Sequence, residues 1–273
     1  MERVSQSDVT LLGESHDNRQ HHLVQNAILQ AVAKTRNTPV VVMEQYDLTQ
    51  QEQLDAIARS NRDPVERSNA FEALMNDGWD RAGYRPLLDT AVHHGLPIVA
   101  ANISRQSLRE VSREGFDALG IQEVERLGLL AHWTDAQQTV LEREIMHGHC
   151  NALPTTAVGG LSKAQRVRDA IMADKILAAV SKRNVHPAVA ILGRGHVRAD
   201  LGVPWYLKNR APGKSVLVIS LEEESDSASP AQSSAAIGVA STGLFDYVIN
   251  VKREIPAPDY CAAFKTSLPP LGK

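Results

Sequence analysis

The 273-residue chain has few aromatic residues, only two cysteines and no marked excess of charge of either sign. Cys150 and Cys261 are far apart in the sequence and form no CxxC pair, so they indicate neither a zinc ribbon nor a need for an oxidising compartment, and we expect two free thiols. Lys and Arg number 29 against 32 Asp and Glu, and no basic stripe is interleaved with aromatic residues. These features disfavour nucleic acid as a partner.

Long hydrophobic runs are also absent. No run approaches the roughly 20 apolar residues of a membrane-spanning helix, and residues 1–5 contain no apolar core of a signal peptide. Hydrophobic residues make up 43% and charged residues 22% of the chain, as in ordinary folded domains. The sequence as written therefore predicts a cytoplasmic protein without a transmembrane span.

Short apolar runs without alternation predict strands that are covered on both faces. They lie at residues 9–12, 40–43, 98–101, 188–192, 216–221 and 244–251. An amphipathic helix is expected over 18–35, capped by Asp17, and another from Pro86 to Gly95. Because strands and helices alternate, we predict an α/β fold with a largely parallel central sheet flanked by helices.

Strand signals disappear between residues 106 and 183, where helical periodicity dominates with breaks near Gly128, Pro154 and Gly159–Gly160. We interpret this stretch as a smaller all-helical subdomain inserted into an α/β sheet domain formed by residues 1–105 and 184–273, the whole making a single structural unit. Residues 222–241 are rich in Ser, Ala and acidic side chains and are predicted to form a surface loop.

Two similar glycine-histidine segments follow predicted strands, Gly-Glu-Ser-His at residues 13–16 and Gly-Arg-Gly-His at residues 193–196. Glycine lets the backbone turn sharply and display a polar side chain at the end of a strand. Ligands of open parallel sheets bind outside the carboxyl ends of the strands, so polar residues at four predicted strand ends are expected to form one site. Those with site chemistry are Glu14, Ser15, His16, Asp17, Glu44, Asn102, Ser104, Arg105, Arg194, His196 and Arg198.

The central candidates are Glu14, His16, Glu44 and His196. Two histidines and two carboxylates can hold a divalent metal, or they can activate a water molecule without one, and their spacing does not choose between these roles. Glu44 directly follows an apolar run, so its carboxylate needs a partner at the edge of a dry core.

Asp174 and Tyr46 are further candidate ligands. Asp174 falls on the apolar stripe of a predicted helix, which makes it a candidate metal ligand, with an arginine ion pair as the alternative. Tyr46 is a candidate iron ligand, with core packing as the alternative. A phosphate or nucleotide site at the first turn is disfavoured, because Glu14 and Asp17 would repel an anion.

Several segments together resemble the ChaN-like haem-binding uptake family. They are residues 13–18 with His22 and Gln25, then 43–45, 100–102, 164–173 and 193–198 with 202–204, and the resemblance extends over about residues 9–220. This family resembles a wider group that includes Tiki proteases, TraB-like proteins and erythromycin esterases. The resemblance implies an α/β sheet with a small helical part.

The resemblance also implies haem binding linked to homodimer formation, and a role in iron uptake. A histidine or tyrosine would bind the iron, and arginines such as Arg105 or Arg198 would meet the propionates. The cofactor-binding candidates are His16, Tyr46, Asn102, Arg105, Arg194, His196 and Arg198. An envelope-associated or periplasmic location is implied if an export signal is missing from this chain.

The wider group suggests an alternative, a metal-dependent esterase or protease. Its catalytic residues would be Glu14, His16, Glu44 and His196, with an arginine stabilising the developing oxyanion. Manganese, cobalt or zinc would be held by His16, Glu44, Asp174 and His196.

Overall fold

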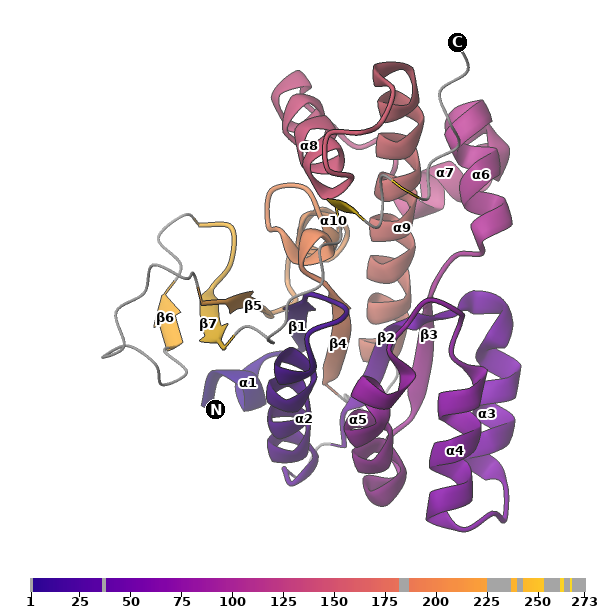
Figure 1. Cartoon of the computed structure of the whole chain (residues 1–273), viewed down its shortest axis with the longest axis vertical. Coiled ribbons are helices and arrows are strands. Elements are labelled where there is room, and N and C mark those ends of the chain that lie inside the picture. The colour runs from indigo at the N-terminus through magenta and orange to yellow at the C-terminus, as the bar shows by residue number, and fades with distance from the viewer. Residues whose placement is uncertain are drawn as a thin grey trace. The chain divides into compact units, whose positions relative to one another are not determined.

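A mostly parallel β-sheet with helices on both faces organises the larger part of the chain (Figure 1). The computed structural model describes residues 2–35, 38–181, 187–224, 237–239 and 243–252, together with 261, 262 and 266. The chain forms two compact units, one of residues 1–104 and 168–253 and one of residues 105–167 and 254–273.

The sheet has the strand order β3-β2-β4-β1-β5-β7-β6. The first six strands in this order run parallel, and β6 pairs antiparallel with β7. The strands are β1 (Val9–Glu14), β2 (Val40–Asp47), β3 (Ile98–Asn102), β4 (Ala188–Gly193), β5 (Val216–Glu223), β6 (Ile237–Val239) and β7 (Tyr247–Val251). All six predicted strands are present, and the predicted α/β class is confirmed.

One strand was not predicted. Strand β6 lies within residues 222–241, which we expected to form a loop, and β5 also continues to Glu223. Most of the rest of that expected loop lies outside the described residues.

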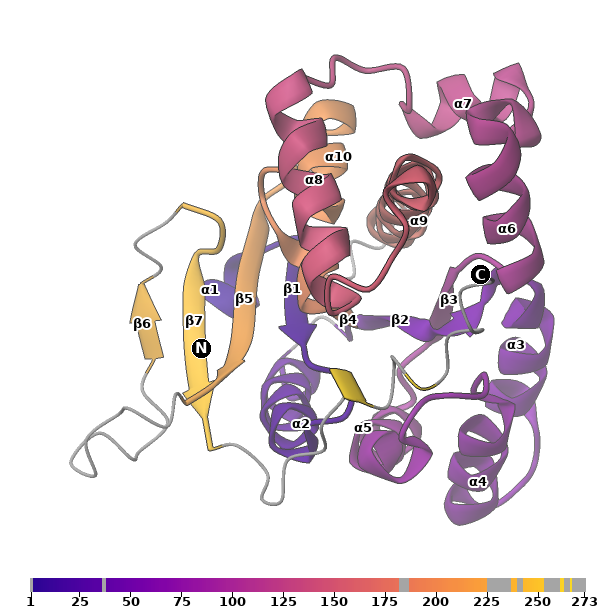
Figure 2. The same ribbon diagram turned by 45° about the horizontal axis from the view of Figure 1, so that its top comes forward.

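The helices of the sheet unit cover both faces. In Figure 2, α2 and α5 lie on one side of the strands, and α10 and α9 lie on the other. The helices of this unit are α1 (Glu2–Gln6), α2 (Arg19–Ala33), α3 (Gln51–Arg59), α4 (Pro64–Leu74), α5 (Arg81–His94), α10 (Val203–Arg210) and the second half of α9 (Thr155–Val180), with the short 3-10 helices η1 (Leu48–Gln50) and η3 (Arg194–Val197). Apolar side chains of α2 and α5, such as Leu29 and Leu88, pack with Leu12 and Ile191 of the strands into a buried core.

Two helix starts differ from the prediction. Helix α2 is capped by Asn18, whose side chain accepts hydrogen bonds from the backbone N–H groups of Gln20 and His21, and not by Asp17. Helix α5 begins at Arg81 and contains Pro86, although proline is normally a helix-start residue. Packing of buried side chains on both sides of Pro86 outweighs the loss of its N–H donor.

The helical unit contains α6 (Arg105–Glu114), η2 (Gly115–Leu119), α7 (Ile121–Leu127), α8 (Asp135–Gly148) and the first half of α9. Breaks occur at Gly128, which is left-handed with φ 71°, and before α9, which starts just after Pro154. The expected break at Gly159–Gly160 is absent. A Cβ on Gly160 would lie 2.3 Å from the carbonyl oxygen of Ser112, so this glycine allows close packing within a continuous helix.

The expectation of free thiols was wrong. Cys150 and Cys261 form a disulfide, with their Cα atoms 5.4 Å apart, and both belong to the helical unit. Cys150 adopts a left-handed conformation with φ 58° at the end of α8. A separation of 111 residues gives no spacing pattern from which the pairing could be inferred.

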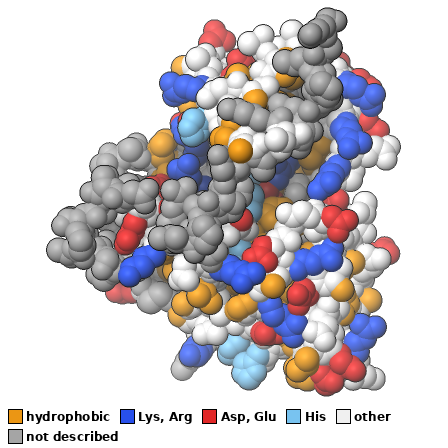
Figure 3. Space-filling view, viewed as in Figure 1, with side chains coloured by type: hydrophobic (Ala, Val, Ile, Leu, Met, Phe, Trp, Pro, Cys, Tyr) orange, Lys and Arg blue, Asp and Glu red, His pale blue; other side chains and the backbone are white. Residues whose placement is uncertain are grey.

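The surface of α3, α4 and α5 mixes both signs of charge. Figure 3 shows Lys or Arg side chains interleaved with Asp and Glu over the lower part of the molecule, where these helices lie. Arg85, for example, pairs with Glu72 at 2.8 Å and with Asp89 at 2.7 Å. Within the described ranges, no helix has the length and apolar character needed to cross a membrane.

Candidate functional site

The two glycine-histidine segments lie side by side at the carboxyl ends of β1 and β4, where Glu14 is in register with Gly193. Each glycine makes room for a side chain of the other segment. A Cβ on Gly193 would lie 2.6 Å from Cε1 of His16, and a Cβ on Gly13 would lie 2.3 Å from Cγ2 of Val197. Both separations are far below ordinary van der Waals contact, so the two turns fit together only without these Cβ atoms.

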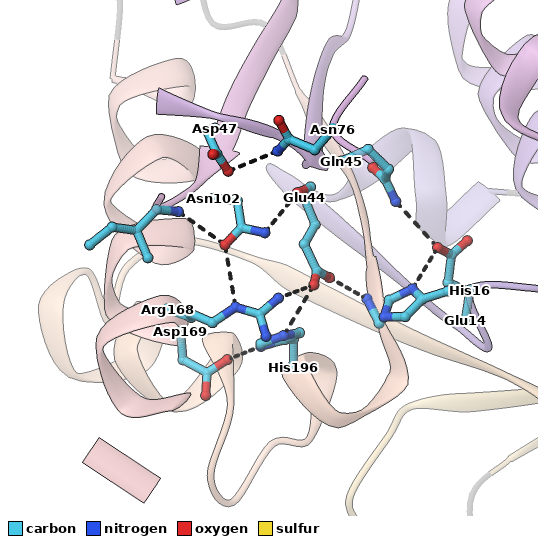
Figure 4. Close-up of polar contacts among 12 residues, drawn as sticks. Glu14, His16, Glu44, Gln45, Asp47, Asn76, Asn102, Arg168, Asp169 and His196 are labelled. Carbon is cyan, nitrogen blue, oxygen red and sulfur yellow. Dashed lines mark hydrogen bonds and ion pairs between the residues drawn. The ribbon is translucent and has the colours of Figure 1, made fainter. Parts of the chain in front are cut away.

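Glu14, the last residue of β1, is fully buried, and Figure 4 shows the donors Gln45 and His16 directed at its carboxylate. Its Oε1 accepts hydrogen bonds from Nδ1 of His16 at 3.1 Å, from Nε2 of Gln45 at 3.3 Å and from the hydroxyl of Tyr84. Its Oε2 lies 3.4 Å from Nε2 of His22. Burial alone would raise the pKa of Glu14, but the hydrogen bonds and charges of His16 and His22 outweigh it and lower that pKa.

His16 is the accessible member of this group, with 44% of its side chain exposed. Glu14 holds Nδ1, and the edge of the ring contacts Trp79, with the ring centroids 4.5 Å apart. Burial opposes the charge of His16, but the hydrogen bond to Glu14 and the charge of Glu44 raise the pKa of the imidazole. A carboxylate on one ring nitrogen orients the imidazole and strengthens the other nitrogen as a ligand.

Glu44 and His196 form a second, more deeply buried cluster. Nε2 of His196 lies 3.3 Å from Oε1 of Glu44, and Nδ1 lies 2.5 Å from Oδ1 of Asp169. Arg168 pairs with the same Oε1, while Oε2 of Glu44 accepts a hydrogen bond of 2.7 Å from the backbone N–H of Gly193. Glu44 thus has the partner that its position after an apolar run requires.

These charges stabilise one another. Burial lowers the pKa of His196, but Glu44 and Asp169 outweigh burial and raise it to about 9. Burial likewise raises the pKa of Glu44, while His196 and Arg168 bring it well below its usual value. At neutral pH, His196 is therefore protonated and lies between two carboxylates, with Nε2 facing Glu44 and Nδ1 facing Asp169.

Asn102 joins this cluster from the end of β3. Its Nδ2 donates to the backbone carbonyl of Glu44 at 3.0 Å, and its Oδ1 accepts from Nε of Arg168 at 3.3 Å (Figure 4). The structure therefore brings together five predicted site residues, which are Glu14, His16, Glu44, Asn102 and His196.

Tyr46 and Asp174 lie elsewhere. Tyr46 is fully buried in the core, and its hydroxyl donates to the carbonyl of Phe71 at 2.8 Å. Asp174 forms an ion pair of 2.8 Å with Arg210, which is the alternative weighed for an acidic residue on an apolar stripe.

The predicted arginines differ in their accessibility. Arg198 makes two hydrogen bonds to Asp200, at 3.1 and 2.9 Å. Arg194 has 52% of its side chain exposed, with Glu222 at 3.6 Å. Arg105 is the first residue of α6 and belongs to the helical unit.

Five residues of the site come from outside the predicted set. His22, Gln45 and Tyr84 surround Glu14, and Arg168 and Asp169 surround Glu44 and His196. His22, Gln45, Arg168 and Asp169 lie in segments that carry the family resemblance, which was the available signal. Tyr84 had no such signal, because the helix that carries it was expected to start after it.

The four residues predicted to bind a metal do not assemble into one site. Asp174 pairs with Arg210, and both nitrogens of His196 face carboxylates. Among the residues that the structure describes, no three or more His, Cys, Asp or Glu side chains are grouped so as to hold a metal ion. Within the described part of the chain, no hydrogen bond or ion pair joins Nε2 of His16 to a carboxylate, and this nitrogen lies beside Gly193.

The similarity to one solved structure supports the assignment of the fold. The structure is similar to ChaN of Campylobacter jejuni, described as showing cofacial haem binding, with a TM-score of 0.70, 20% identity, and coverage of 91% of this chain and 89% of that one. It is also similar to a mutant erythromycin esterase EreC in its open conformation, with a TM-score of 0.47, 9% identity and coverage of 91% and 76%. The type III effector HopBA1 gives a TM-score of 0.49, 11% identity and coverage of 92% and 90%.

Sequence comparison gives the family. No curated protein matches the chain. The model of the family described as haem-binding uptake, Tiki superfamily, ChaN matches residues 1–207. The chain therefore belongs to the ChaN family of haem-binding uptake proteins in the Tiki superfamily.

Proposed function

We propose that this protein binds haem and that Nε2 of His16 is a ligand of the iron. One observation carries the proposal, namely that His16 is half-exposed while its Nδ1 is hydrogen-bonded to the buried carboxylate of Glu14. Histidines that bind metals typically donate their other ring N–H to a carboxylate, which fixes the tautomer and makes the free nitrogen a stronger ligand.

The surroundings of His16 fit this role. The backbone of Gly193 lies against the ring where a Cβ would collide with it, and Trp79 contacts the ring edge. When bound, haem supplies an iron that accepts an axial nitrogen ligand. The chain's own contribution is to hold the imidazole in one orientation at the surface, with Nδ1 protonated and bonded to Glu14.

We propose that two copies of the chain share the haem site. His16 of one copy would supply a single nitrogen ligand, so a second copy would supply further groups around the haem, and cofacial binding is reported for ChaN of Campylobacter jejuni. Among the predicted arginines of the sheet unit, Arg194 is the more exposed and is the better candidate for a propionate, because Arg198 is held by Asp200.

Titration with haemin tests the proposal. We expect a saturable Soret band with the wild-type protein and at least a tenfold weaker interaction with His16→Ala, since the ring supplies the iron ligand. The exposed His93 on α5 provides the control, and His93→Ala should bind as the wild type does. A molar mass that doubles on haemin addition supports the shared site. Absence of a specific spectrum, or equal binding by His16→Ala, would refute the proposal.

A hydrolase is the second candidate, because an exposed imidazole bonded to a buried carboxylate is also the arrangement of a general base. His16 and Glu14 would activate water, while His196 keeps its proton at neutral pH and would stabilise negative charge together with Arg168. Hydrolysis of activated esters, with and without added manganese, cobalt or zinc, tests this candidate. Activity that survives in His16→Ala would exclude this role.

We propose an oxidising location such as the cell envelope, contrary to the cytoplasmic location expected from the sequence as written. The disulfide between Cys150 and Cys261 supports it, since such bonds persist in oxidising compartments and are rare in the cytosol. Thiol alkylation of the protein before and after reduction, in fractionated cells, measures whether the bond is present and where. Free thiols in a cytosolic fraction would contradict this proposal.

A further inference from the structure

Tyr84 has no role in the proposed function as described so far, yet it contacts the centre of the site. Its hydroxyl donates to Oε1 of Glu14, the same oxygen that accepts the hydrogen bond from His16. The side chain is fully buried, and its position is fixed by neighbours on two sides. The ring centroid of His22 lies 4.0 Å away, and that of Trp79 lies 6.0 Å away.

The hydrogen bonds to Glu14 are distributed unevenly. Oε1 accepts from His16, Gln45 and Tyr84, whereas the buried Oε2 faces Nε2 of His22 in a longer ion pair of 3.4 Å. Donors on one oxygen compete for the same electron density. Each donor also stabilises the negative charge of the carboxylate and so lowers its basicity, and Tyr84 therefore weakens the hydrogen bond that Glu14 can accept from His16.

Close packing around Tyr84 holds this donor in place. Tyr84 enters the site from the first turns of α5, where the adjacent Gly83 allows His22 to approach closely, since a Cβ there would lie 2.5 Å from its Nδ1. A buried phenol is not needed to fill this space, because a phenylalanine ring would make the same ring contacts. The hydroxyl is the part of the side chain that acts on Glu14.

We propose that Tyr84 is a positioning residue that limits the hydrogen bond between Glu14 and His16, and so sets how strongly the His16 nitrogen donates to the haem iron. This inference rests on the proposed function. Hydrogen bonds to an axial histidine tune its donor strength and, through it, the reduction potential of the iron. Without the phenol, the carboxylate interacts more strongly with Nδ1–H, the imidazole becomes a stronger donor, and the ferric state is favoured.

Tyr84→Phe tests the proposal, with Tyr46→Phe as a matched control. Both tyrosines are fully buried, but the hydroxyl of Tyr46 donates to a backbone carbonyl in the core, whereas that of Tyr84 donates to Glu14 and also lies 3.4 Å from the backbone carbonyl of His16. In the haem-loaded protein, we expect Tyr84→Phe to lower the reduction potential and Tyr46→Phe to leave it unchanged. In the haem-free protein, the imidazole ¹⁵N resonances of His16 should shift in Tyr84→Phe and stay unchanged in Tyr46→Phe.

A second variant keeps the test decisive if Tyr84→Phe does not fold. Gln45→Met removes another donor from the same oxygen with little change in size, and it should shift the potential and the His16 resonances in the same direction as Tyr84→Phe. If Tyr84→Phe and Gln45→Met match Tyr46→Phe in both measurements, the inference is wrong. If the wild type binds no haem, the proposed function fails, while the ¹⁵N spectra still decide whether Tyr84 acts on His16.

Discussion

Replacing Gly193 by alanine should disable the site while leaving the fold nearly as stable as before. The backbone allows it, because Gly193 has φ −62° and ψ 146°, which any residue adopts. The new Cβ would lie 2.6 Å from Cε1 and 2.8 Å from Nε2 of His16, and 3.5 Å from Oε2 of Glu44. The ring of His16 is half-exposed and is therefore the group that can move.

The size of the effect follows from these distances. Carbon atoms in contact prefer about 3.5 to 4.0 Å, so the ring has to move by roughly 1 Å. The hydrogen bond between Nδ1 of His16 and Glu14 is 3.1 Å long and would be strained or broken by such a movement. Loss of the carboxylate that orients a metal-binding histidine typically reduces affinity by about 10- to 100-fold, which is the loss of haemin affinity that we expect.

Gly13→Ala is the matched comparison with the opposite outcome. Its Cβ would meet Cγ2 of Val197 at 2.3 Å and the backbone Cα of Arg194 at 3.2 Å, and Val197 is fully buried. Neither neighbour can move into solvent, so overpacking should lower the free energy of unfolding by about 1–3 kcal/mol. Thermal unfolding and haemin titration of both variants separate the two effects. The steric reasoning is refuted if Gly193→Ala binds haemin as tightly as the wild type and its His16 resonances are unchanged.

Three further predictions concern stability. Because the pKa of His196 is raised from 6.5 to about 9, its protonation contributes its full stabilisation below pH 6.5, and this contribution is lost as the pH rises through 9. The free energy of unfolding should therefore fall by up to about 3 kcal/mol over this range, and Asp169→Asn should reduce that fall. Burial lowers the pKa of His21 to about 4, so stability should also fall between pH 6.5 and 4, by at most about 3 kcal/mol, and denaturant unfolding of His21→Gln should show a flatter acid limb. Reduction of the disulfide, which joins residues 111 apart, should destabilise the helical unit by up to about 5 kcal/mol. This prediction is contradicted if the melting curve is the same with and without reductant, or the same for Cys150→Ser and the wild type.

The sheet could be predicted from sequence because buried parallel strands leave a direct signal, a short apolar run. Strand β6 gave none, since its three residues follow a long Ser- and Ala-rich stretch. The start of α5 was misplaced because Pro86 is a local helix-start signal, whereas the actual start depends on the burial of Tyr84 and Leu87. Gly160 resembled a helix break because the close approach of Ser112, which requires a glycine there, is a tertiary contact.

The site was predictable where strands carry it. Glu14 and Asn102 end their strands, Glu44 follows Met43, where the pairing of β2 with β4 stops, and parallel strands bring such residues to one edge. Tyr84 and Asp169 come instead from helices, and the direction in which a helical side chain points depends on how the helix packs against the sheet. That rotation is set by tertiary contacts and has no local signature.

The reciprocal fit of Gly13 with Val197 and of Gly193 with His16 has a consequence for engineering and for sequence variation. Each turn sets the steric limit of the other, so neither segment can be transplanted to another protein without its counterpart. A larger residue at 193 displaces the side chain at position 16 unless that side chain becomes small, and a larger residue at 13 fits only if the side chain at position 197 becomes small. Relatives that have lost the histidine at position 16 should therefore be free to vary at position 193, while position 13 remains glycine.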